Sequence, residues 1–343
     1  MSRNFLITGG AGFIGSNYVS RLLDRGEKVT IYDNLSRAGA SRNLVWLQEK
    51  FGKNAFQLVM GDARDSALLT TSSCEVDIII HLAAQVAVTT SVVKPREDFE
   101  VNALGTFNVL EAARLNERKP TVIYASTNKV YGEMEDVKVV ESATRWQYAD
   151  LPMGCPETQP LDFHSPYGCS KGTGDQYVRD YSRIYDLPTV VLRQSCIYGP
   201  RQFGVEDQGW VAWMIIAAIT GHPLTIYGDG KQIRDVLYVD DLLDAYDAAI
   251  EKIEMVKGQV FNLGGGPKNT MSIWTEFSPL LEKLLGRVIK VNRGDWRPGD
   301  QKFFVADIRK AGQDLAWKPQ IHVEEGVGRL FKWVNENRDL FQG

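Results

Sequence analysis

A glycine-rich turn near the start of the chain determines which class of fold the sequence can adopt. The apolar run Phe5–Thr8 stops at the motif Gly9-x-x-Gly12-x-x-Gly15, and Phe13–Arg25 then carries apolar residues at helical spacing. A second apolar run, Lys28–Asp33, follows Gly26. This order of strand, turn, helix and strand predicts a βαβ unit, whose parallel strands are buried and therefore read as apolar runs.

The same alternation continues over the first half of the chain. Further strands are expected at Phe56–Met60, Asp77–Leu82, Thr121–Ala125 and Thr189–Arg193, with helices at Val101–Leu115 and Tyr167–Tyr185. We therefore predict an α/β fold built on a Rossmann-like, doubly wound parallel sheet. Glu133–Gln159 has weak periodicity and is expected to be a long loop.

Beyond Arg193 the elements become shorter, and glycines and prolines separate them more often. This predicts a smaller C-terminal lobe over the carboxyl ends of the strands, where open α/β sheets bind ligands. We expect residues 1–200 plus about 233–260 to form the dinucleotide-binding domain. Residues from about 201–232 plus 261–343 are expected to form the substrate-binding lobe.

Composition limits the partners that this chain can have. The formal net charge of −4 gives no field suited to nucleic acid, and the longest apolar stretches are too short to span a bilayer. The four cysteines form no C-x-x-C pair and the four histidines lie far apart in sequence, so reduced thiols and no metal site are expected. Because the first residues lack the pattern of a secretory leader, we expect a soluble, cytoplasmic protein that binds neither nucleic acid nor membrane.

The glycine turn has the chemistry of a dinucleotide site. Glycines let the backbone approach a pyrophosphate, and the helix N-terminus offers unpaired N–H groups and a partial positive charge. Asp33 can accept hydrogen bonds from both ribose hydroxyls of NAD and would repel the 2′-phosphate of NADP, although Arg37 could tolerate that phosphate. We predict NAD as the cofactor. The residues expected to line its site are Gly9, Gly12, Phe13, Ile14, Gly15, Asp33, Asn34, Arg37, Asp62, Ala63, Leu82, Ala83, Ala84, Ser126, Tyr167 and Lys171.

Tyr167 and Lys171 form a second constellation. Their spacing puts both polar ends on one face of the predicted helix, one turn apart. An ammonium beside a phenol favours the phenolate, so a tyrosine that ordinarily titrates near pH ~10 becomes a usable base. Ser126-Thr127 follows a buried strand, where a hydroxyl can hydrogen-bond both a substrate oxygen and the Tyr167 phenol. Tyr167, Lys171 and Thr127 are the expected catalytic residues.

These motifs have a known counterpart. The set Thr8–Gly15, Asp33, Asn102, Ser126-Thr127, Tyr167 and Lys171 resembles the extended short-chain dehydrogenase/reductase family that acts on nucleotide sugars, over essentially the whole chain. The resemblance implies that Thr127 occupies the position of the family's catalytic Ser or Thr. It also implies that Asn102 belongs to the cofactor site, and that Arg234 and Arg297 match the arginines that hold the sugar-nucleotide diphosphate. The residues expected to bind this substrate are Thr127, Asn128, Lys129, His164, Ser165, Arg201, Gln208, Tyr227, Arg234, Arg297 and Asp300.

The residues beside Thr127 distinguish the chemistries of this family. Its 4,6-dehydratases carry an Asp-Glu pair there, because eliminating water needs an acid and a base in addition to the redox step. Here these positions are Asn128 and Lys129, so dehydration is disfavoured. Reducing 3,5-epimerases use a Cys and a His, and the cysteines together with His164 keep that option open.

Three stretches narrow the resemblance further. Ser126–Gly132, Leu161–Lys171 and Arg201–Phe203 with Asp207–Val211 are similar to the CDP-tyvelose (CDP-paratose) 2-epimerases. This similarity implies NAD-dependent epimerisation at C2 of a CDP-linked (deoxy)hexose through a transient 2-keto sugar. Hydride would return to the opposite face, and NAD would stay tightly bound because the redox change is closed. Cys196 stands where 4-epimerases usually have Asn, which argues against a 4-epimerase.

Three alternatives stay open. A sugar-nucleotide 4-epimerase would use the same machinery, and a net dehydrogenase or reductase would consume added NAD. A dinucleotide-sensing regulator on the same fold commonly lacks the Tyr or the Lys, and both are present here. Finally, the helices Val101–Leu115 and Tyr167–Tyr185 carry apolar residues on more than one face. Such helices pair across a two-fold axis in this family, which implies a homodimer or homotetramer.

Overall fold

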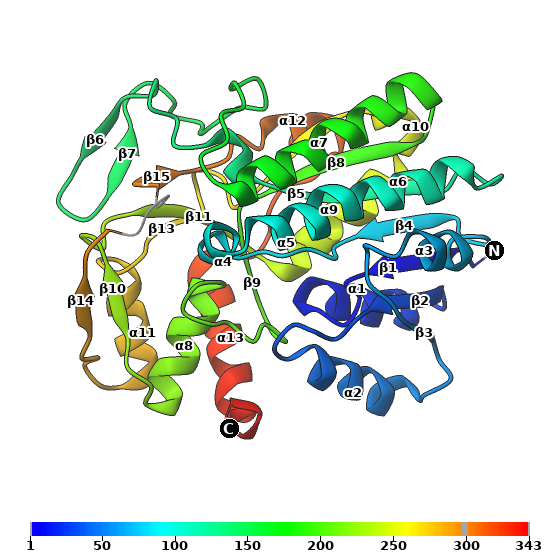
Figure 1. Cartoon of the computed structure of the whole chain (residues 1–343). Helices are drawn as coiled ribbons and strands as arrows, with labels where there is room; N and C mark the ends of the chain where they lie inside the picture. Colours follow the sequence, from blue (N-terminus) through cyan, green and yellow to red (C-terminus); the bar gives the residue numbers. More distant parts are fainter. Residues whose placement is uncertain (1, 297–300, 342–343) are drawn as a thin grey trace.

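A seven-stranded parallel sheet forms the larger part of the molecule, and a smaller lobe lies at one end of it (Figure 1). The computed structural model describes residues 2–296 and 301–341. The strand order is β12-β8-β5-β4-β1-β2-β3, with every pairing parallel. The strands are β1 (Asn4–Thr8), β2 (Lys28–Asp33), β3 (Gln57–Met60), β4 (Ile78–His81), β5 (Thr121–Thr127), β8 (Thr189–Gln194) and β12 (Val260–Leu263). The predicted Rossmann-like, doubly wound sheet is confirmed.

Helices cover both faces of this sheet because its strands are apolar on both sides. Successive residues point to opposite faces, so Ile7 packs in one buried cluster and Leu6 in another. The Ile7 face is covered by α1 (Phe13–Asp24), α2 (Ala40–Phe51) and α9 (Val239–Glu251), and the Leu6 face by α3 (Ser66–Ser72), α6 (Gly105–Leu115) and α7 (Pro166–Tyr185). The short helices α4 (Val88–Val93), α5 (Pro95–Phe99) and α10 (Ile253–Val256) complete this part.

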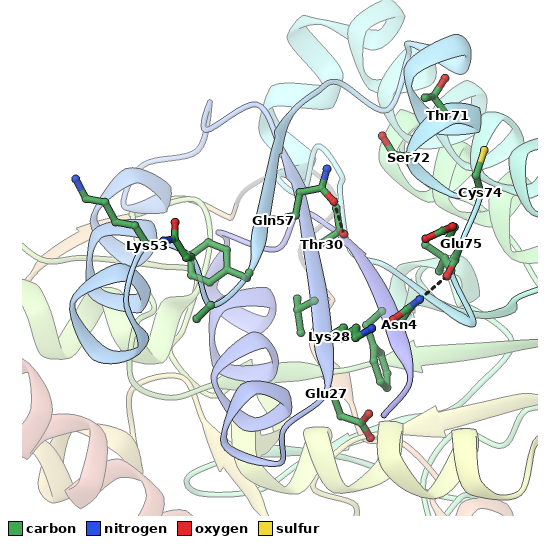
Figure 2. A pocket seen from close by; sticks show the side chains of 16 residues that line it. Asn4, Glu27, Lys28, Thr30, Lys53, Gln57, Thr71, Ser72, Cys74 and Glu75 are labelled. Carbon is green, nitrogen blue, oxygen red and sulfur yellow. Dashed lines mark hydrogen bonds between the residues drawn. The ribbon is translucent and has the colours of Figure 1, made fainter. Parts of the chain in front are cut away.

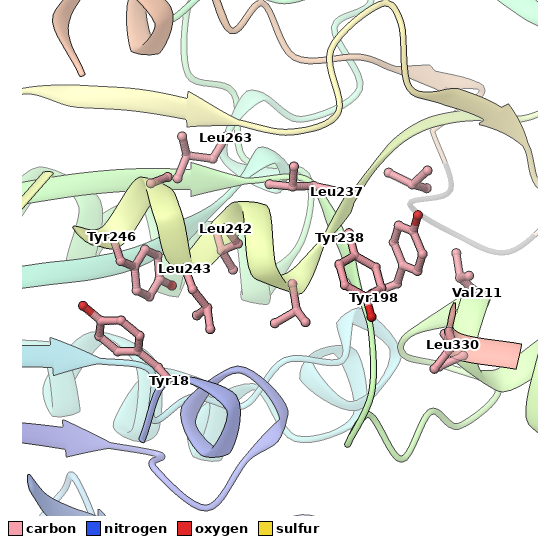
Figure 3. Close-up of a cluster of buried hydrophobic side chains, with 14 of the residues drawn as sticks. Tyr18, Tyr198, Val211, Leu237, Tyr238, Leu242, Leu243, Tyr246, Leu263 and Leu330 are labelled. Atoms are coloured by element: carbon pink, nitrogen blue, oxygen red, sulfur yellow. The ribbon is translucent and has the colours of Figure 1, made fainter. Parts of the chain in front are cut away.

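One hydrophobic core continues from the large sheet into the smaller lobe (Figure 3). Tyr18 of α1 meets the Tyr246 ring edge-on at 5.6 Å, and its hydroxyl donates to Asp247 Oδ1 at 2.9 Å. Further along the same cluster, the ring of Tyr198 lies edge-on to Tyr238 at 5.6 Å. Each fully buried side chain of this size contributes roughly 1.5–3 kcal/mol. The shared core therefore fixes how the two parts pack together.

The described residues of the smaller lobe form two small sheets. One pairs β10 (Thr225–Tyr227) with β14 (Asn292–Gly294), and the other joins β9 (Cys196–Tyr198), β11 (Ile233–Tyr238), β13 (Thr270–Ser272) and β15 (Phe303–Phe304). Its helices are α8 (Trp210–Thr220), α11 (Phe277–Leu285), α12 (Arg309–Asp314) and α13 (Val323–Glu336), followed by the 3₁₀ turn η3 (Arg338–Phe341). The smaller C-terminal lobe is confirmed. The exact division of the chain stays a prediction, and β12 crosses the expected boundary at 260.

Two local expectations differ from the structure. The expected loop 133–159 contains a hairpin of β6 (Val139–Glu141) and β7 (Trp146–Tyr148), whose three-residue strands are too short to show a period in the sequence. The helix expected from Val101 is part of a longer helical segment that starts at α5 and passes through the π-helical turn η1 (Glu100–Leu104). Among the described residues, no helix is both long enough and apolar enough to cross a membrane.

Candidate active site

A cavity of about 480 Å³ opens at the carboxyl ends of β1, β2 and β4, where this class of sheet binds ligands. All but one of the residues expected at the cofactor site line it. They are Gly9, Gly12, Phe13, Ile14, Gly15, Asp33, Asn34, Arg37, Asp62, Ala63, Leu82, Ala83, Ala84, Ser126, Tyr167 and Lys171. The exception, Asn102, is buried nearby and accepts the N–H of Gln85, another wall residue, at 2.9 Å.

The glycines of the first turn are required by close backbone contacts. Gly9 has φ +72°, and a Cβ there would lie 2.8 Å from the backbone nitrogen of Ala83. A Cβ at Gly15 would collide with the carbonyl oxygen of Gly9 and lie 2.7 Å from the Cα of Gly10. The turn therefore leaves bare backbone facing the cavity at the N-terminus of α1, which is the arrangement that accepts a pyrophosphate.

Asp33 ends β2 at the cavity wall. Its carboxylate accepts backbone N–H groups from Ala11 at 3.0 Å and from Leu35 at 2.8 Å. Burial raises the pKa of Asp33 above its ordinary value, and these two hydrogen bonds act in the opposite direction. They also fix the orientation of the carboxylate, whose remaining lone pairs can accept hydroxyl donors from a ribose.

Asp62 and Arg64 form the outer edge of the same wall. The Arg64 guanidinium donates to both carboxylate oxygens of Asp62 at 2.9 and 2.8 Å, and this interaction lowers the pKa of Asp62 to about 2. Asn34 Nδ2 also donates to Asp62 at 3.0 Å. This hydrogen bond links the segments that follow β2 and β3 beside the cavity.

Tyr167 and Lys171 lie in the first two turns of α7, which begins where Ser165 Oγ accepts the N–H of Gly168 at 3.0 Å. Both side chains line the cavity and are otherwise buried, with 8% and 4% of their surface exposed. Thr127, the last residue of β5, hydrogen-bonds the Tyr167 phenol. The structure thus brings together the three residues expected to be catalytic.

The electrostatics of this pair differ from the sequence-based expectation. Burial raises the pKa of Tyr167 to about 12, against the lowering effect of the Thr127 hydrogen bond, and burial lowers the pKa of Lys171 to about 7. The expectation that Lys171 holds the pKa of Tyr167 below its ordinary value was therefore wrong. The physical reason is that desolvation disfavours the charged form of both the Tyr167 phenol and the Lys171 amine.

Of the residues expected to bind the sugar nucleotide, Arg201 and Gln208 line the cavity. Asn128 and Lys129 lie in the 3₁₀ turn η2 (Asn128–Tyr131), directly after Thr127. The backbone N–H of Lys129 donates to Thr127 Oγ1 at 3.2 Å. Neither Asn128 nor Lys129 is part of the cavity wall.

The other expected substrate residues have different surroundings. Arg234 of β11 is buried and donates to the carbonyls of Ile233 and Gln301, both at 2.7 Å, and it is not part of the cavity wall. Tyr227 donates to Glu206 Oε1 at 3.0 Å. His164 Nε2 pairs with Asp162 at 2.8 Å, which raises the pKa of the imidazole. Arg297 and Asp300 lie outside the described residues.

Sequence reasoning missed several wall residues. Gln85 and Gln194 lie at or just after the ends of β4 and β8, and their position at a parallel strand end could have identified them. Phe203, from the smaller lobe, also lines the cavity. The sequence pointed to it only as part of the stretch Arg201–Phe203 that resembles the 2-epimerases, and not as a site residue. Exposed Glu133, Glu135 and His164 place potential ligand atoms within 4.8 Å of one another, outside this cavity.

A second concavity, of about 680 Å³, lies at the amino ends of β1, β2 and β3 (Figure 2). It is lined by dispersed side chains such as Lys53 and Glu75, and Asn4 Nδ2 donates there to the carbonyl of Glu75 at 2.8 Å. None of the expected catalytic or cofactor residues contributes to it. We therefore assign the candidate active site to the cavity at the carboxyl ends.

The fold and this site define an enzyme class, and comparison with known proteins agrees. Residues 6–330 match the family model described as GDP-mannose 4,6 dehydratase. The chain belongs to this family, within the extended short-chain dehydrogenases/reductases that act as nucleotide-sugar epimerases and dehydratases.

Individual relatives cover nearly the whole chain. A CDP-paratose 2-epimerase of Salmonella typhi is 43% identical over 337 residues, covering 96% of this chain and 98% of that protein. The structure of UDP-glucose 4-epimerase from Thermotoga maritima with UDP-glucose has a TM-score of 0.84 at 30% identity, covering 98% and 99%. That of UDP-glucuronic acid 4-epimerase from Bacillus cereus, in complex with UDP-glucuronic acid and NAD, has a TM-score of 0.81 at 29% identity, covering 97% and 99%.

Proposed function

We propose that this protein epimerises C2 of a CDP-linked deoxyhexose, of the CDP-paratose to CDP-tyvelose type, with NAD as its cofactor. The observation that carries the proposal is the meeting of Tyr167, Lys171 and Thr127 at one end of the cavity that begins at the glycine turn. The choice of substrate is supported by the 43% identity to a CDP-paratose 2-epimerase and by the local similarity of the catalytic stretches.

The cavity walls fit NAD. At Gly9 and Gly15 a Cβ would meet neighbouring backbone, so the turn can place its main chain on the cavity wall beside the N-terminus of α1 only with glycine there. Asp33 offers an oriented carboxylate for the ribose of the adenosine half, which favours NAD over NADP. When bound, NAD supplies the acceptor and later the donor of the hydride that an epimerisation needs, without net consumption.

The chain's own residues handle the proton. Tyr167 accepts the proton of the C2 hydroxyl as the hydride leaves C2, and Thr127 donates a hydrogen bond that steadies the oxygen. Lys171 balances the negative charge of the phenolate. The 2-keto sugar then turns in the site, receives hydride on its other face and takes the proton back from Tyr167.

Turning the sugar requires an anchor elsewhere on the substrate. Arg201 and Gln208 line the cavity, and Arg234 and Arg297 remain the proposed contacts of the diphosphate. Asn128 and Lys129 do not form the acid and base pair that dehydration requires. Together with Tyr167, this set favours hydride removal and return over elimination.

A 4-epimerase is the second candidate, because a solved UDP-glucose 4-epimerase matches 98% of the chain. The test is to give the purified protein CDP-paratose, CDP-glucose and UDP-glucose, with deuterium at C2 or at C4. Our proposal expects CDP-tyvelose from CDP-paratose and a rate lowered by deuterium at C2 alone. A slowing with deuterium at C4 would establish the second candidate, and stoichiometric consumption of added NAD would indicate a net reductase or dehydrogenase. Binding of NAD without any turnover would indicate the regulator.

We also propose that the chain assembles as a homodimer or homotetramer through α6 and α7, which lie side by side in Figure 1. Phe107 and Tyr177 meet edge-on at 5.9 Å there, with 37% and 45% of their surfaces exposed. Changing Phe107 to Glu should shift the mass measured by light scattering toward the monomer, and an unchanged mass would place the contact elsewhere.

Cytoplasmic location is likewise proposed, with the four free thiols as its support.

A further inference from the structure

Lys171 is a buried ammonium without an ion pair among the described residues. Its Nζ lies 4.3 Å from the centroid of the Tyr124 ring, which supplies a cation–π contact. The acidic groups that raise its pKa are Asp175 of α7 and, with a smaller effect, Asp98 of α5, whose carboxylate accepts Ser170 Oγ, next to Lys171 in the sequence, at 2.5 Å. His81 of β4 also faces it. His81 is neutral at physiological pH, because burial lowers its pKa to about 3. The countercharge for Lys171 must therefore come from the two carboxylates.

Asp175 is already neutralised by another cation. Arg193 donates to its two oxygens from Nε at 2.8 Å and from Nη2 at 2.9 Å, and both side chains are fully buried. Ser126 Oγ donates to the same carboxylate at 2.8 Å. A bidentate pair of this kind leaves little net charge for a more distant ammonium.

Asp98 has no cationic partner of this kind among residues 2–296 and 301–341. Its side chain is 1% exposed and accepts hydrogen bonds from three neutral donors, Ser170 Oγ at 2.5 Å, Gln85 Nε2 at 2.9 Å and Asn102 Nδ2 at 3.1 Å. Three donors stabilise the ionised form without cancelling its charge. The other charged residues of α5, which include Arg96 and Glu97, are exposed to solvent. The negative charge of Asp98 thus remains directed at the site.

We propose that Asp98 is a positioning residue whose negative charge keeps Lys171 in its ammonium form at neutral pH. The same charge opposes the phenolate of Tyr167, which also faces Thr127 and the Arg37 guanidinium. Asp98 thereby keeps a proton on each member of the pair until substrate and cofactor add their own charges. The role in catalysis rests on the proposed function, whereas the effect on Lys171 does not.

The test is Asp98→Asn, which is nearly isosteric and removes the charge. The amide oxygen of the new side chain can still accept hydrogen bonds from Gln85 and Asn102. Its NH₂ group can donate to Ser170 Oγ. The Ser170 hydroxyl can then donate its own hydrogen to the Tyr167 carbonyl, 3.2 Å away. The reactivity of Lys171 toward trace acetic anhydride, followed by mass spectrometry across pH, reports its titration without substrate. We expect its midpoint to fall by roughly one pH unit. The pH profile of kcat/KM should move in the same direction as a whole.

Two controls separate charge from structure. Ser170→Ala removes one hydrogen bond but leaves the carboxylate charged. Arg96→Gln removes a charge from the same short helix at a side chain that is 91% exposed and lies outside the cavity wall. Both should leave the Lys171 midpoint close to that of the parent protein, because the first keeps the charge and solvent screens the second. If Asp98→Asn does not fold, Asp98→Ser removes the same charge with a smaller side chain.

An unchanged Lys171 midpoint in either folded Asp98 variant would overturn the proposal, whatever happens to activity. A lowered midpoint in a protein that epimerises none of the tested sugars would uphold it and reject the proposed function instead. A uniform loss of kcat at every pH, with the midpoint intact, would reduce Asp98 to a structural role.

Discussion

Arg37 and Gln208, which lie 171 positions apart in the sequence, meet at the cavity wall, where Arg37 Nη2 donates to Gln208 Oε1 at 2.7 Å. The first comes from the loop after β2, and the second from the segment that precedes α8 in the smaller lobe. A nearby contact runs between the same two parts, since Asn43 Nδ2 donates to the carbonyl of Arg201 at 3.2 Å. The smaller lobe therefore closes one side of the proposed cofactor site.

Removing this contact should loosen the cofactor. We expect Gln208→Ala to weaken dinucleotide binding by roughly three- to tenfold, the net worth of one ordinary hydrogen bond, because the Arg37 side chain is exposed to water after the change. The amount of NAD that stays with the protein through gel filtration and its Kd by calorimetry both measure this. Gln57→Ala is the control, because Gln57 accepts from Thr30 at 3.4 Å at the opposite end of the sheet (Figure 2). Equal affinities in the two variants would contradict a role for the Arg37–Gln208 contact.

Loss of the Tyr167 hydroxyl should abolish proton transfer. We expect Tyr167→Phe to lower kcat by about 10²–10⁴ while the variant still binds NAD, because the phenol is the only proposed group that exchanges the C2 proton. Thr127→Val should lower kcat less, since it removes one hydrogen bond to the reacting oxygen. Tyr181→Phe, on the same helix but bonded to Glu111 at 2.7 Å, is the matched control and should keep kcat.

Asp235 should make stability depend on pH. Burial raises its pKa to about 6, against hydrogen bonds from Ser195 and from the backbone N–H groups of Ala306 and Gly266. A carboxyl group whose pKa is higher in the folded protein holds its proton there longer, so the free energy of unfolding falls as pH rises from ~4 to ~6. The loss is roughly 3 kcal/mol and is complete above the folded-state pKa.

Asp235→Asn should remove that decline, because the amide does not ionise and can still accept from the same backbone donors. Urea unfolding at pH 4.5 and at pH 7 measures the difference for each protein. A variant whose stability falls with pH as steeply as the parent's would show that another group is responsible.

The strands, and the residues that line the cavity beside them, could be predicted because their signals are local. Four buried residues in a row, Ile78–His81, indicate a parallel strand, and the glycine spacing indicates a turn that only small residues allow. Asp33 follows from its place at the end of the second strand. Each of these inferences needs only a few neighbouring residues, because local sequence determines these elements with little influence from tertiary packing.

The electrostatics could not be predicted, because they depend on burial and on distant partners. Tyr167 and Lys171 share a helix face as expected, yet desolvation moves both pKa values toward the neutral forms. Asp98 lies in a short helix that reads as an ordinary surface segment until packing buries it against Ser170. Arg234 donates to two backbone carbonyls that could not be foreseen from the sequence, and its expected contact with the diphosphate stays a prediction.

Two glycines of α13 should respond to alanine in opposite ways. A Cβ at Gly326 would collide with the Tyr198 hydroxyl and lie 3.1 Å from Tyr238 Cδ2, whereas a Cβ at Gly328 would have no atom within 4 Å. Gly326→Ala must displace buried rings that belong to the core shared by the two parts, at a cost of roughly 1–3 kcal/mol. Gly328→Ala should instead stabilise the helix by about 0.5–1 kcal/mol, because alanine loses less conformational entropy there.

Urea unfolding of the two variants beside the parent protein tests this packing directly. The matched pair differs by only two positions on one helix, so a change in helix propensity alone would shift both midpoints upward. Opposite shifts require that the Gly326 face of α13 is pressed against Tyr198. Since Tyr198 ends β9, such a result would place the stability of this packing directly before the segment that carries Arg201 and Gln208 to the cavity wall.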